Sequence, residues 1–341
     1  YYIAGSRSEI VDPIGNRDIF YFNALGGITR HIDALGFKTD NVFDGLNRMV
    51  QTTMPEGNQI KWTLDASNNP LTRTQVPKPG SGLANIVETF TYDPLWAKVK
   101  TYKDGRLNTT TYTYDVTLGN LLTIQRPVVG GLTPTVTMTW NARGQMLTRT
   151  DETNIVTKFT YDVTTESLTT QVVDYFAGGG HLNLTTSFGY NAFGDVTSLT
   201  DPSYKSTTFS WDNLRQLKQK TDPAPFSYVM NLNYDDNGNL LNIQRQTGTT
   251  PAWQIYSWTY SLTNRKLTAV DPSLNTSTWT YDGKDRIQTV TDAQSRQWQY
   301  AYDALDRLSV TTDPTSTVCD TRTFTNNGML ASVKDARNNT T

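Results

Sequence analysis

Residues 302–308 read Tyr302-Asp303-Ala304-Leu305-Asp306-Arg307-Leu308, and a close copy stands 21 residues earlier as Tyr281-Asp282-Gly283-Lys284-Asp285-Arg286-Ile287. Fourteen such copies can be placed in the 341 residues, and six of the thirteen steps between them are 21 residues long. Self-similarity at a short period is typical of an array in which each repeat packs on its neighbours. The sequence therefore predicts one continuous array over residues 1–341. The copies start at Phe22, Phe43, Leu64, Tyr92, Tyr114, Trp140, Tyr161, Tyr190, Trp211, Tyr234, Tyr260, Tyr281, Tyr302 and Phe324.

Turn-forming residues follow the aromatic residue at set positions. The next residue is Asp or Asn in twelve of the fourteen copies, and the fourth residue on is Gly, Asn or Asp in ten. Asp and Asn side chains bond the backbone of a tight turn, while Gly, Asn and Asp best tolerate a positive φ. We therefore expect a hairpin turn in each repeat. Positive φ is expected at Gly144, Gly194, Gly238, Gly328, Asn47, Asn264, Asp285 and Asp306.

The residues before each turn alternate with the period of a β-strand. Trp279 and Tyr281, like Tyr300 and Tyr302, are two residues apart and should share one face, where we expect them to be mainly buried. A shorter apolar stretch follows each turn and ends in a second break, such as Asp201-Pro202. Its spacing is irregular in places, which indicates a bulge or a strong twist. The repeat is thus strand, turn, strand, turn, and the fold class is all-β: tandem β-hairpins in a long, coiled antiparallel sheet.

Composition excludes several classes of protein. The chain has 30 Lys and Arg against 32 Asp and Glu, without a basic cluster, so nucleic acid is not expected as a partner. No stretch approaches the roughly 18 uninterrupted apolar residues that span a membrane.

Few residues are candidates for chemistry. His31 and His181 have no partners at metal-ligand spacing, and Cys319 is the single cysteine. The Asp residues recur once per repeat at turn positions and lack the dense spacing of a calcium loop. We therefore expect no catalytic residue, no metal site and no cofactor, and the chain is not expected to be an enzyme.

The repeat motif resembles that of the RHS/YD-repeat family. The resemblance is carried by Tyr190-Asn191-Ala192-Phe193-Gly194-Asp195-Val196, which continues to Asp201-Pro202, and by Tyr234-Asp235-Asp236-Asn237-Gly238-Asn239-Leu240. The family includes bacterial Rhs polymorphic toxins, the B and C components of insecticidal ABC toxin complexes, and the teneurins. The residues expected to carry the repeat signature, in a structural role, are Tyr190, Asn191, Gly194, Trp211, Asp212, Tyr234, Asp235, Gly238, Tyr281, Asp282, Tyr302, Asp303 and Leu308.

The resemblance implies a segment of a hollow β-shell that helps to enclose a C-terminal toxin domain of a secreted bacterial protein. Its partners would then be that enclosed domain, further repeats of the same polypeptide, and components of a secretion system or toxin complex. The alternative is an extracellular adhesion or carbohydrate-binding module, which would present aromatic residues on an outer groove. The family's shells are closed by a region rich in Asp-Pro-x-Gly motifs that contains an aspartyl autoprotease. Asp12-Pro13-Ile14-Gly15 has those letters but stands at the wrong end of the chain, so no catalytic residue is carried over.

The chain starts at Tyr1 and stops inside a repeat, so we expect it to be a fragment of a longer protein. Open strand edges at both ends of such an array would favour association with other chains.

Overall fold

The structure is a computed structural model that describes residues 2–4, 6–178, 180–248 and 252–341. Every regular element in these ranges is a β-strand, as the sequence predicts, and the described part of the chain has no helix with the length and apolar character needed to cross a membrane. The chain divides into two compact units. The first contains the residues up to Thr109 together with Ser277–Thr341, and the second contains Thr110–Thr276.

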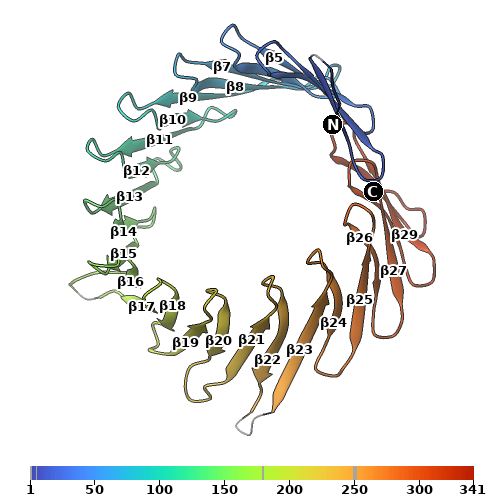
Figure 1. The fold of residues 1–341 in the computed structure, drawn as a ribbon. Helices are drawn as coiled ribbons and strands as arrows, with labels where there is room; N and C mark the ends of the chain where they lie inside the picture. Colours follow the sequence, from blue (N-terminus) through green and yellow to red (C-terminus); the bar gives the residue numbers. More distant parts are fainter. Residues whose placement is uncertain (1, 5, 179, 249–251) are drawn as a thin grey trace. The chain divides into compact units, whose positions relative to one another are not determined.

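In the first unit, two antiparallel meanders are formed by segments that are far apart in the sequence (Figure 1). The N-terminal strands are β1 (Tyr2–Ala4), β2 (Arg7–Val11), β3 (Arg17–Phe22), β4 (Ile28–Ile32), β5 (Lys38–Phe43), β6 (Met49–Thr53), β7 (Gln59–Leu64), β8 (Pro70–Val76), β9 (Ile86–Tyr92) and β10 (Val99–Lys103). The C-terminal strands are β25 (Thr276–Tyr281), β26 (Ile287–Thr291), β27 (Gln297–Tyr302), β28 (Leu308–Thr312), β29 (Val318–Phe324) and β30 (Leu330–Asp335).

The second unit is a single antiparallel meander in which each strand pairs with the next along the chain. Its strands are β11 (Thr109–Tyr114), β12 (Leu121–Gln125), β13 (Thr135–Trp140), β14 (Met146–Thr150), β15 (Val156–Tyr161), β16 (Leu168–Val173), β17 (Leu184–Tyr190), β18 (Val196–Thr200), β19 (Ser206–Trp211), β20 (Leu217–Thr221), β21 (Val229–Tyr234), β22 (Leu240–Gln246), β23 (Trp253–Tyr260) and β24 (Lys266–Val270).

A β-bulge follows the turn of each repeat. In the β25–β26 hairpin, Tyr281 pairs with Ile287 and Thr280 with Thr289, so Gln288 is left between them without an opposite residue. The same register shift occurs in the β27–β28 hairpin, although Leu308 and Val310 alternate regularly in the sequence. The expected bulge is therefore confirmed, and it is a feature of the repeat rather than of irregular copies.

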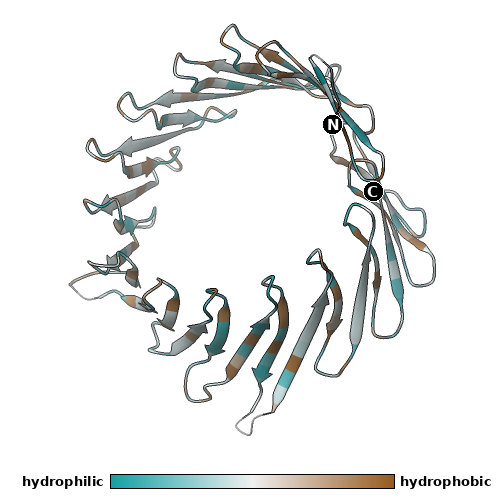
Figure 2. Ribbon diagram, in the orientation of Figure 1, coloured by the Kyte–Doolittle hydropathy of each residue, from teal (hydrophilic) through white to brown (hydrophobic). Residues whose placement is uncertain are grey.

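The two faces of the hairpins differ in chemistry. Threonine hydroxyls pair across one face, as in Thr280 and Thr289, which are exposed and 2.7 Å apart. The aromatic residues lie on the opposite face, and Figure 2 shows hydrophilic and hydrophobic residues alternating along the strands. Trp279, Tyr281, Tyr300 and Tyr302 are only partly buried, which corrects the expectation of mainly buried side chains. They share a face as predicted, but neighbouring hairpins cover only their flanks.

The hydrophobic core is thin. Among the described residues, Val136 and Met138 on β13 are the buried hydrophobic ones, with 1% and 7% of their surface exposed. Ordinary domains bury apolar faces between two packed layers, whereas each unit here is a sheet without a covering layer of helices. Strand pairing, turn chemistry and contacts between adjacent hairpins must therefore supply most of the stability.

Candidate functional site

The candidate site is the repeat turn, and its aspartate organises the backbone. In the β27–β28 turn, Asp303 Oδ1 accepts hydrogen bonds from the N–H groups of Leu305 (2.9 Å) and Arg307 (3.1 Å). The fourth turn residue, Asp306, has a φ of 63°. Positive φ is confirmed at all eight positions where it was expected, from Asn47 (58°) to Gly328 (83°).

The signature residues occupy equivalent places in their hairpins. Tyr190, Trp211, Tyr234, Tyr281 and Tyr302 each end the first strand, and Leu308 begins the second strand of its hairpin. Asn191 accepts hydrogen bonds from the turn backbone in the same way as Asp212, Asp235, Asp282 and Asp303. Gly194 and Gly238 are the left-handed fourth residues of their turns, at φ 83° and 82°.

The polar edge of each signature aromatic reaches the preceding repeat. Tyr302 donates from its hydroxyl to the carbonyl oxygen of Ile287 at 3.0 Å, and Ile287 is the residue at the bulge of the previous hairpin. Tryptophan serves in the same place through its indole N–H. The equivalent bonds are Tyr92 to Pro70, Trp140 to Leu121, Tyr161 to Met146, Tyr190 to Leu168, Trp211 to Val196, Tyr234 to Leu217 and Tyr260 to Leu240, all between 2.8 and 3.1 Å.

A phenylalanine copy shows why this carbonyl needs a donor. Phe43 has no hydroxyl, and the carbonyl oxygen of Ile28 in the preceding hairpin accepts a bond of 2.9 Å from Asn41 Nδ2 instead. A backbone carbonyl in a partly buried sheet is costly to leave without a hydrogen bond. The tyrosine or tryptophan of the motif thus joins successive repeats through the bulge.

We expect the change Tyr190→Phe to lower the free energy of unfolding by about 1 kcal/mol, because it leaves the Leu168 carbonyl without its donor. Urea unfolding would measure the loss. Tyr204→Phe is the matched control, since Tyr204 is 91% exposed and should tolerate the loss of its hydroxyl. Equal stability of the two variants would contradict a role for the hydroxyl in joining repeats.

Arginine at the fifth position after the aromatic also links neighbouring repeats. Arg286 bonds its own Asp282 at 2.6 Å, bonds Asp306 of the next turn at 2.6 Å and lies 4.6 Å from the centre of the Tyr302 ring. Arg307 repeats the arrangement with Asp303 at 2.6 Å and the Phe324 ring at 4.2 Å. Stacking of a guanidinium on an aromatic face is a favourable cation–π geometry.

These contacts lower the pKa of the turn carboxylates. The side chain of Arg48, followed by its backbone N–H, lowers the pKa of Asp44. At Asp303, burial opposes the shift, but Arg307 and the backbone N–H groups outweigh it and the pKa is lowered. The turn aspartates are consequently held in the charged form that the hydrogen bonds require.

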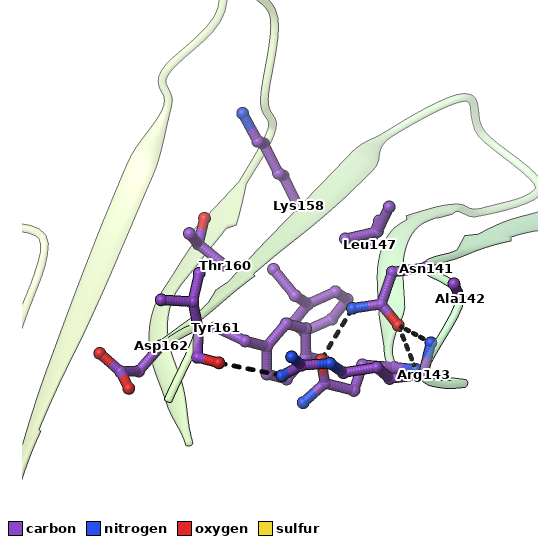
Figure 3. A pocket seen from close by; sticks show the side chains of 11 residues that line it. Asn141, Ala142, Arg143, Leu147, Lys158, Thr160, Tyr161 and Asp162 are labelled. Atoms are coloured by element: carbon purple, nitrogen blue, oxygen red, sulfur yellow. Dashed lines mark hydrogen bonds between the residues drawn. The ribbon is translucent and has the colours of Figure 1, made fainter. Parts of the chain in front are cut away.

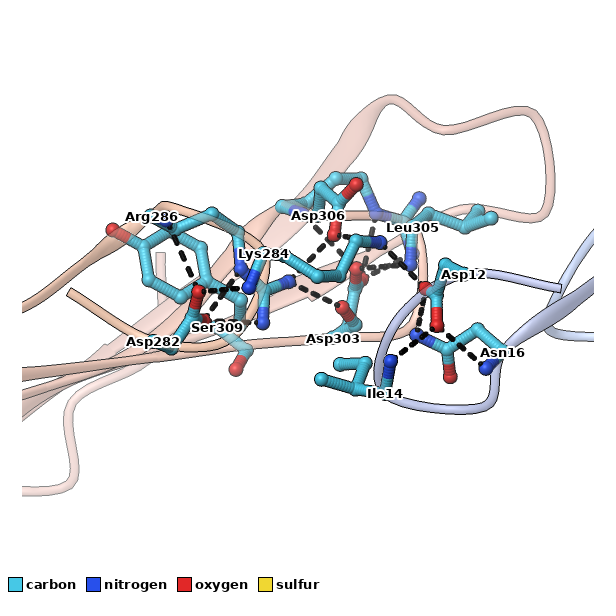
Figure 4. Close-up of polar contacts among 12 residues, drawn as sticks. Asp12, Ile14, Asn16, Asp282, Lys284, Arg286, Asp303, Leu305, Asp306 and Ser309 are labelled. Atoms are coloured by element: carbon cyan, nitrogen blue, oxygen red, sulfur yellow. Dashed lines mark hydrogen bonds and ion pairs between the residues drawn. The ribbon is translucent and has the colours of Figure 1, made fainter. Parts of the chain in front are cut away.

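In the first unit, a buried lysine joins segments that lie about 270 residues apart. Lys284 of the β25–β26 turn bonds Asp306 at 2.5 Å and Asp12 of the β2–β3 turn at 2.8 Å (Figure 4). The Lys284 side chain is only 14% exposed. Burial disfavours its charge, yet the two carboxylates outweigh that effect and raise the pKa of Lys284. Burial likewise opposes, but does not prevent, a lowered pKa at Asp12.

A second contact of the same kind lies farther along these segments. The N–H of Asn326 donates to Glu56 Oε1 at 3.1 Å, and the N–H of Glu56 donates to Asn327 Oδ1 at 3.1 Å. Asn327 Nδ2 also donates to Asn58 Oδ1 at 2.6 Å. We call the two contacts together the turn seam: the β2–β3 and β6–β7 turns meet the β25–β26 and β29–β30 turns.

Sequence reasoning did not identify the residues of the turn seam. Lys284 stands where other repeats have Leu25, Leu46, Phe193 or Leu214, so its charge departs from the repeat pattern. That departure was the available signal. Its partner Asp12 could not be inferred, because the pairing depends on how the array winds.

A groove in the second unit lies between the β13–β14 and β15–β16 hairpins (Figure 3). It has a volume of about 480 Å³ and is lined by turn residues, including Arg143, and by Tyr161. Arg143 donates to the Val163 carbonyl and bonds Glu166, both at 3.0 Å, while the Tyr161 hydroxyl is bonded to Met146. The polar groups of these residues are thus engaged with neighbouring hairpins.

The candidate residues for chemistry have structural surroundings. His31 bonds Asp18 at 2.7 Å and stacks on Phe20 with ring centres 4.5 Å apart, and His181 bonds Asp174 at 2.5 Å. Cys319 is partly buried, and burial raises the pKa of its thiol. Within the described ranges, no group of three His, Cys, Asp or Glu side chains could hold a metal ion.

Comparison with known proteins links the repeats to one family. The RHS Repeat family model matches residues 190–225 and 281–318. No curated protein sequence matches the chain at a significant level.

Solved structures share the fold. A TcdB2-TccC3-TEV crystal structure aligns over 94% of this chain and 19% of its own, with 14% identity and a TM-score of 0.73. A Photorhabdus luminescens Tc holotoxin pore aligns over 93% and 21%, with 13% identity and a TM-score of 0.58. The chain therefore spans about one fifth of the length of the proteins that it matches.

Proposed function

Because this chain belongs to the RHS/YD-repeat family, we propose that it is a non-catalytic wall segment of a shell that encloses a C-terminal toxin domain. RHS repeats and the likeness to the TcdB2-TccC3 fold support a structural role. Enclosure asks the wall to be continuous and mechanically coherent, without a specific reactive group. The proposed setting is a secreted or cell-surface bacterial toxin, with the enclosed domain and further repeats of the same polypeptide as partners.

The observation that carries the proposal is the turn seam. A sheet can form a wall only if segments distant in the sequence are held edge to edge, since open margins would leave gaps. In the first unit, Lys284 and the Glu56–Asn327 pair supply such a junction between turns about 270 residues apart. Ionic and hydrogen-bonded contacts at these turns join the two segments without requiring strand pairing.

The aromatic residues favour a wall over the alternative of carbohydrate binding. Binding modules present aromatic faces with free polar edges, whereas the hydroxyls of Tyr161, Tyr190 and Tyr234 are bonded to backbone carbonyls of the preceding hairpin. Their role in the sheet accounts for the aromatic at this position of the motif.

Limited proteolysis of the natural, longer protein would test the proposal. The domain that follows the array should resist protease in the wild type. The change Lys284→Glu, which places three carboxylates together in the turn seam, should make that domain cleavable at a faster rate. Lys218→Glu is the matched control, because Lys218 is an exposed lysine on β20. Cleavage of the domain in the wild type as fast as in isolation would refute enclosure.

A further inference from the structure

The turn seam shows how two different rims of the array fit together. The first-turn rim consists of the turns that follow the signature aromatic, such as Asp282–Asp285, and the second-turn rim consists of the turns between repeats, such as Asp12–Gly15. In the seam, a second turn contacts first turns through Lys284 and again through Glu56. The two rims are therefore complementary surfaces.

Apolar side chains at the first-turn rim are covered where the seam forms and exposed elsewhere. Leu305, the third residue after Tyr302, is partly buried beside the Lys284–Asp306 contact. The same position is 71–75% exposed in four turns that have no such contact, namely at Leu25, Leu46, Phe193 and Leu214. Large apolar side chains that recur on one exposed edge mark an interaction surface.

The second-turn rim shows a matching set. The fourth residue of these turns is Leu107, Tyr204 and Leu274 in three of them, with 70%, 91% and 81% of the surface exposed. All three have positive φ, between 60° and 69°, where Gly or Asn would be less strained. Bulky apolar residues at these positions have no partner side chain within their own turn that would account for them, which points to a contact from outside.

We propose that these two exposed rims dock on each other between copies of this chain, with the first-turn rim of one copy on the second-turn rim of the next. The occupant is a second copy because the seam already joins one rim of each kind within a single chain. This surface differs from the open strand edges, which pair through backbone groups. The two rims are different surfaces, so the contact is heterologous and forms open-ended chains rather than closed dimers.

Sedimentation velocity at increasing concentration would test the proposal with two variants of the whole chain. The first-rim variant carries Leu25→Asn, Leu46→Asn, Phe193→Asn and Leu214→Asn; Asn237 already occupies this position in another repeat. The second-rim variant carries Leu107→Asn, Tyr204→Asn and Leu274→Asn; Asn154 and Asn338 occupy this position at φ 66° and 65°. Both sets of changes therefore suit the local backbone, and circular dichroism would verify the fold.

The wild type should form a concentration-dependent ladder of oligomers, and each variant alone should associate at least about tenfold more weakly. An equimolar mixture of the two variants retains one intact rim of each kind and should form a 1:1 complex that grows no further. Association of either variant as strong as that of the wild type would overturn the proposal. A monomeric wild type, or a mixture that fails to form the 1:1 complex, would overturn it as well.

Discussion

Acidification below about pH 4 is expected to unfold this protein over a narrow range of pH. The folded state lowers the pKa of many turn aspartates, among them Asp44, Asp104, Asp235 and Asp335. A carboxyl group whose pKa is lowered on folding stabilises the protein above its unfolded pKa, and this contribution is lost as the pH falls toward the folded value. The effect recurs in successive hairpins, so the losses add. Thermal melting between about pH 7 and pH 3 would measure it.

Asparagine provides the matched control for the acid prediction. Asn191 accepts the same two backbone bonds as the aspartates, at 2.9 and 3.0 Å, and cannot be protonated in this range. A variant with Asp104→Asn, Asp235→Asn and Asp335→Asn should melt at a similar temperature near neutral pH and lose less stability in acid. An unchanged acid midpoint in this variant would show that other groups cause the acid sensitivity.

The change Val136→Asp should destabilise the second unit by about 4 kcal/mol or more. Val136 is 1% exposed on β13, and a carboxylate there would lose its hydration without gaining a basic partner on that strand. Thr137→Asp is the matched control because Thr137 is exposed on the opposite face of the same strand, and its effect should stay within about 0.5 kcal/mol. Urea unfolding followed by circular dichroism would measure both.

Similar costs for the two β13 variants would mean that the strand has no protected face. Such a result would also contradict the assignment of Val136 and Met138 to the hydrophobic core. The test is sensitive because so few side chains in this thin sheet are buried.

Local features of this protein follow directly from its sequence. The Asp or Asn after each aromatic bonds the turn, and the residue three positions later takes a positive φ, at Asp306 as at Gly194. These features depend on residues within one hairpin, so a short motif contains all the information they need. Strand alternation and the bulge after the turn are local in the same sense.

Contacts between adjacent repeats could be predicted only in part. The alternation places Trp279 and Tyr281 on one face, but it does not show that the face lacks a second layer, and these side chains are partly exposed as a result. The hydroxyl bond from Tyr302 to the Ile287 carbonyl depends on the distance between neighbouring hairpins at the bulge. A motif indicates which residues recur, whereas the sheet geometry decides which atoms meet.

Contacts between distant segments were decided by the tertiary structure alone. Lys284 meets Asp12, and Glu56 meets Asn326 and Asn327, because the two segments of the first unit come together after about 270 residues of chain. That separation depends on small twists summed over many hairpins, and no local pattern encodes the sum. The sequence therefore specifies the repeat, and the accumulated geometry of the sheet specifies where its distant turns join.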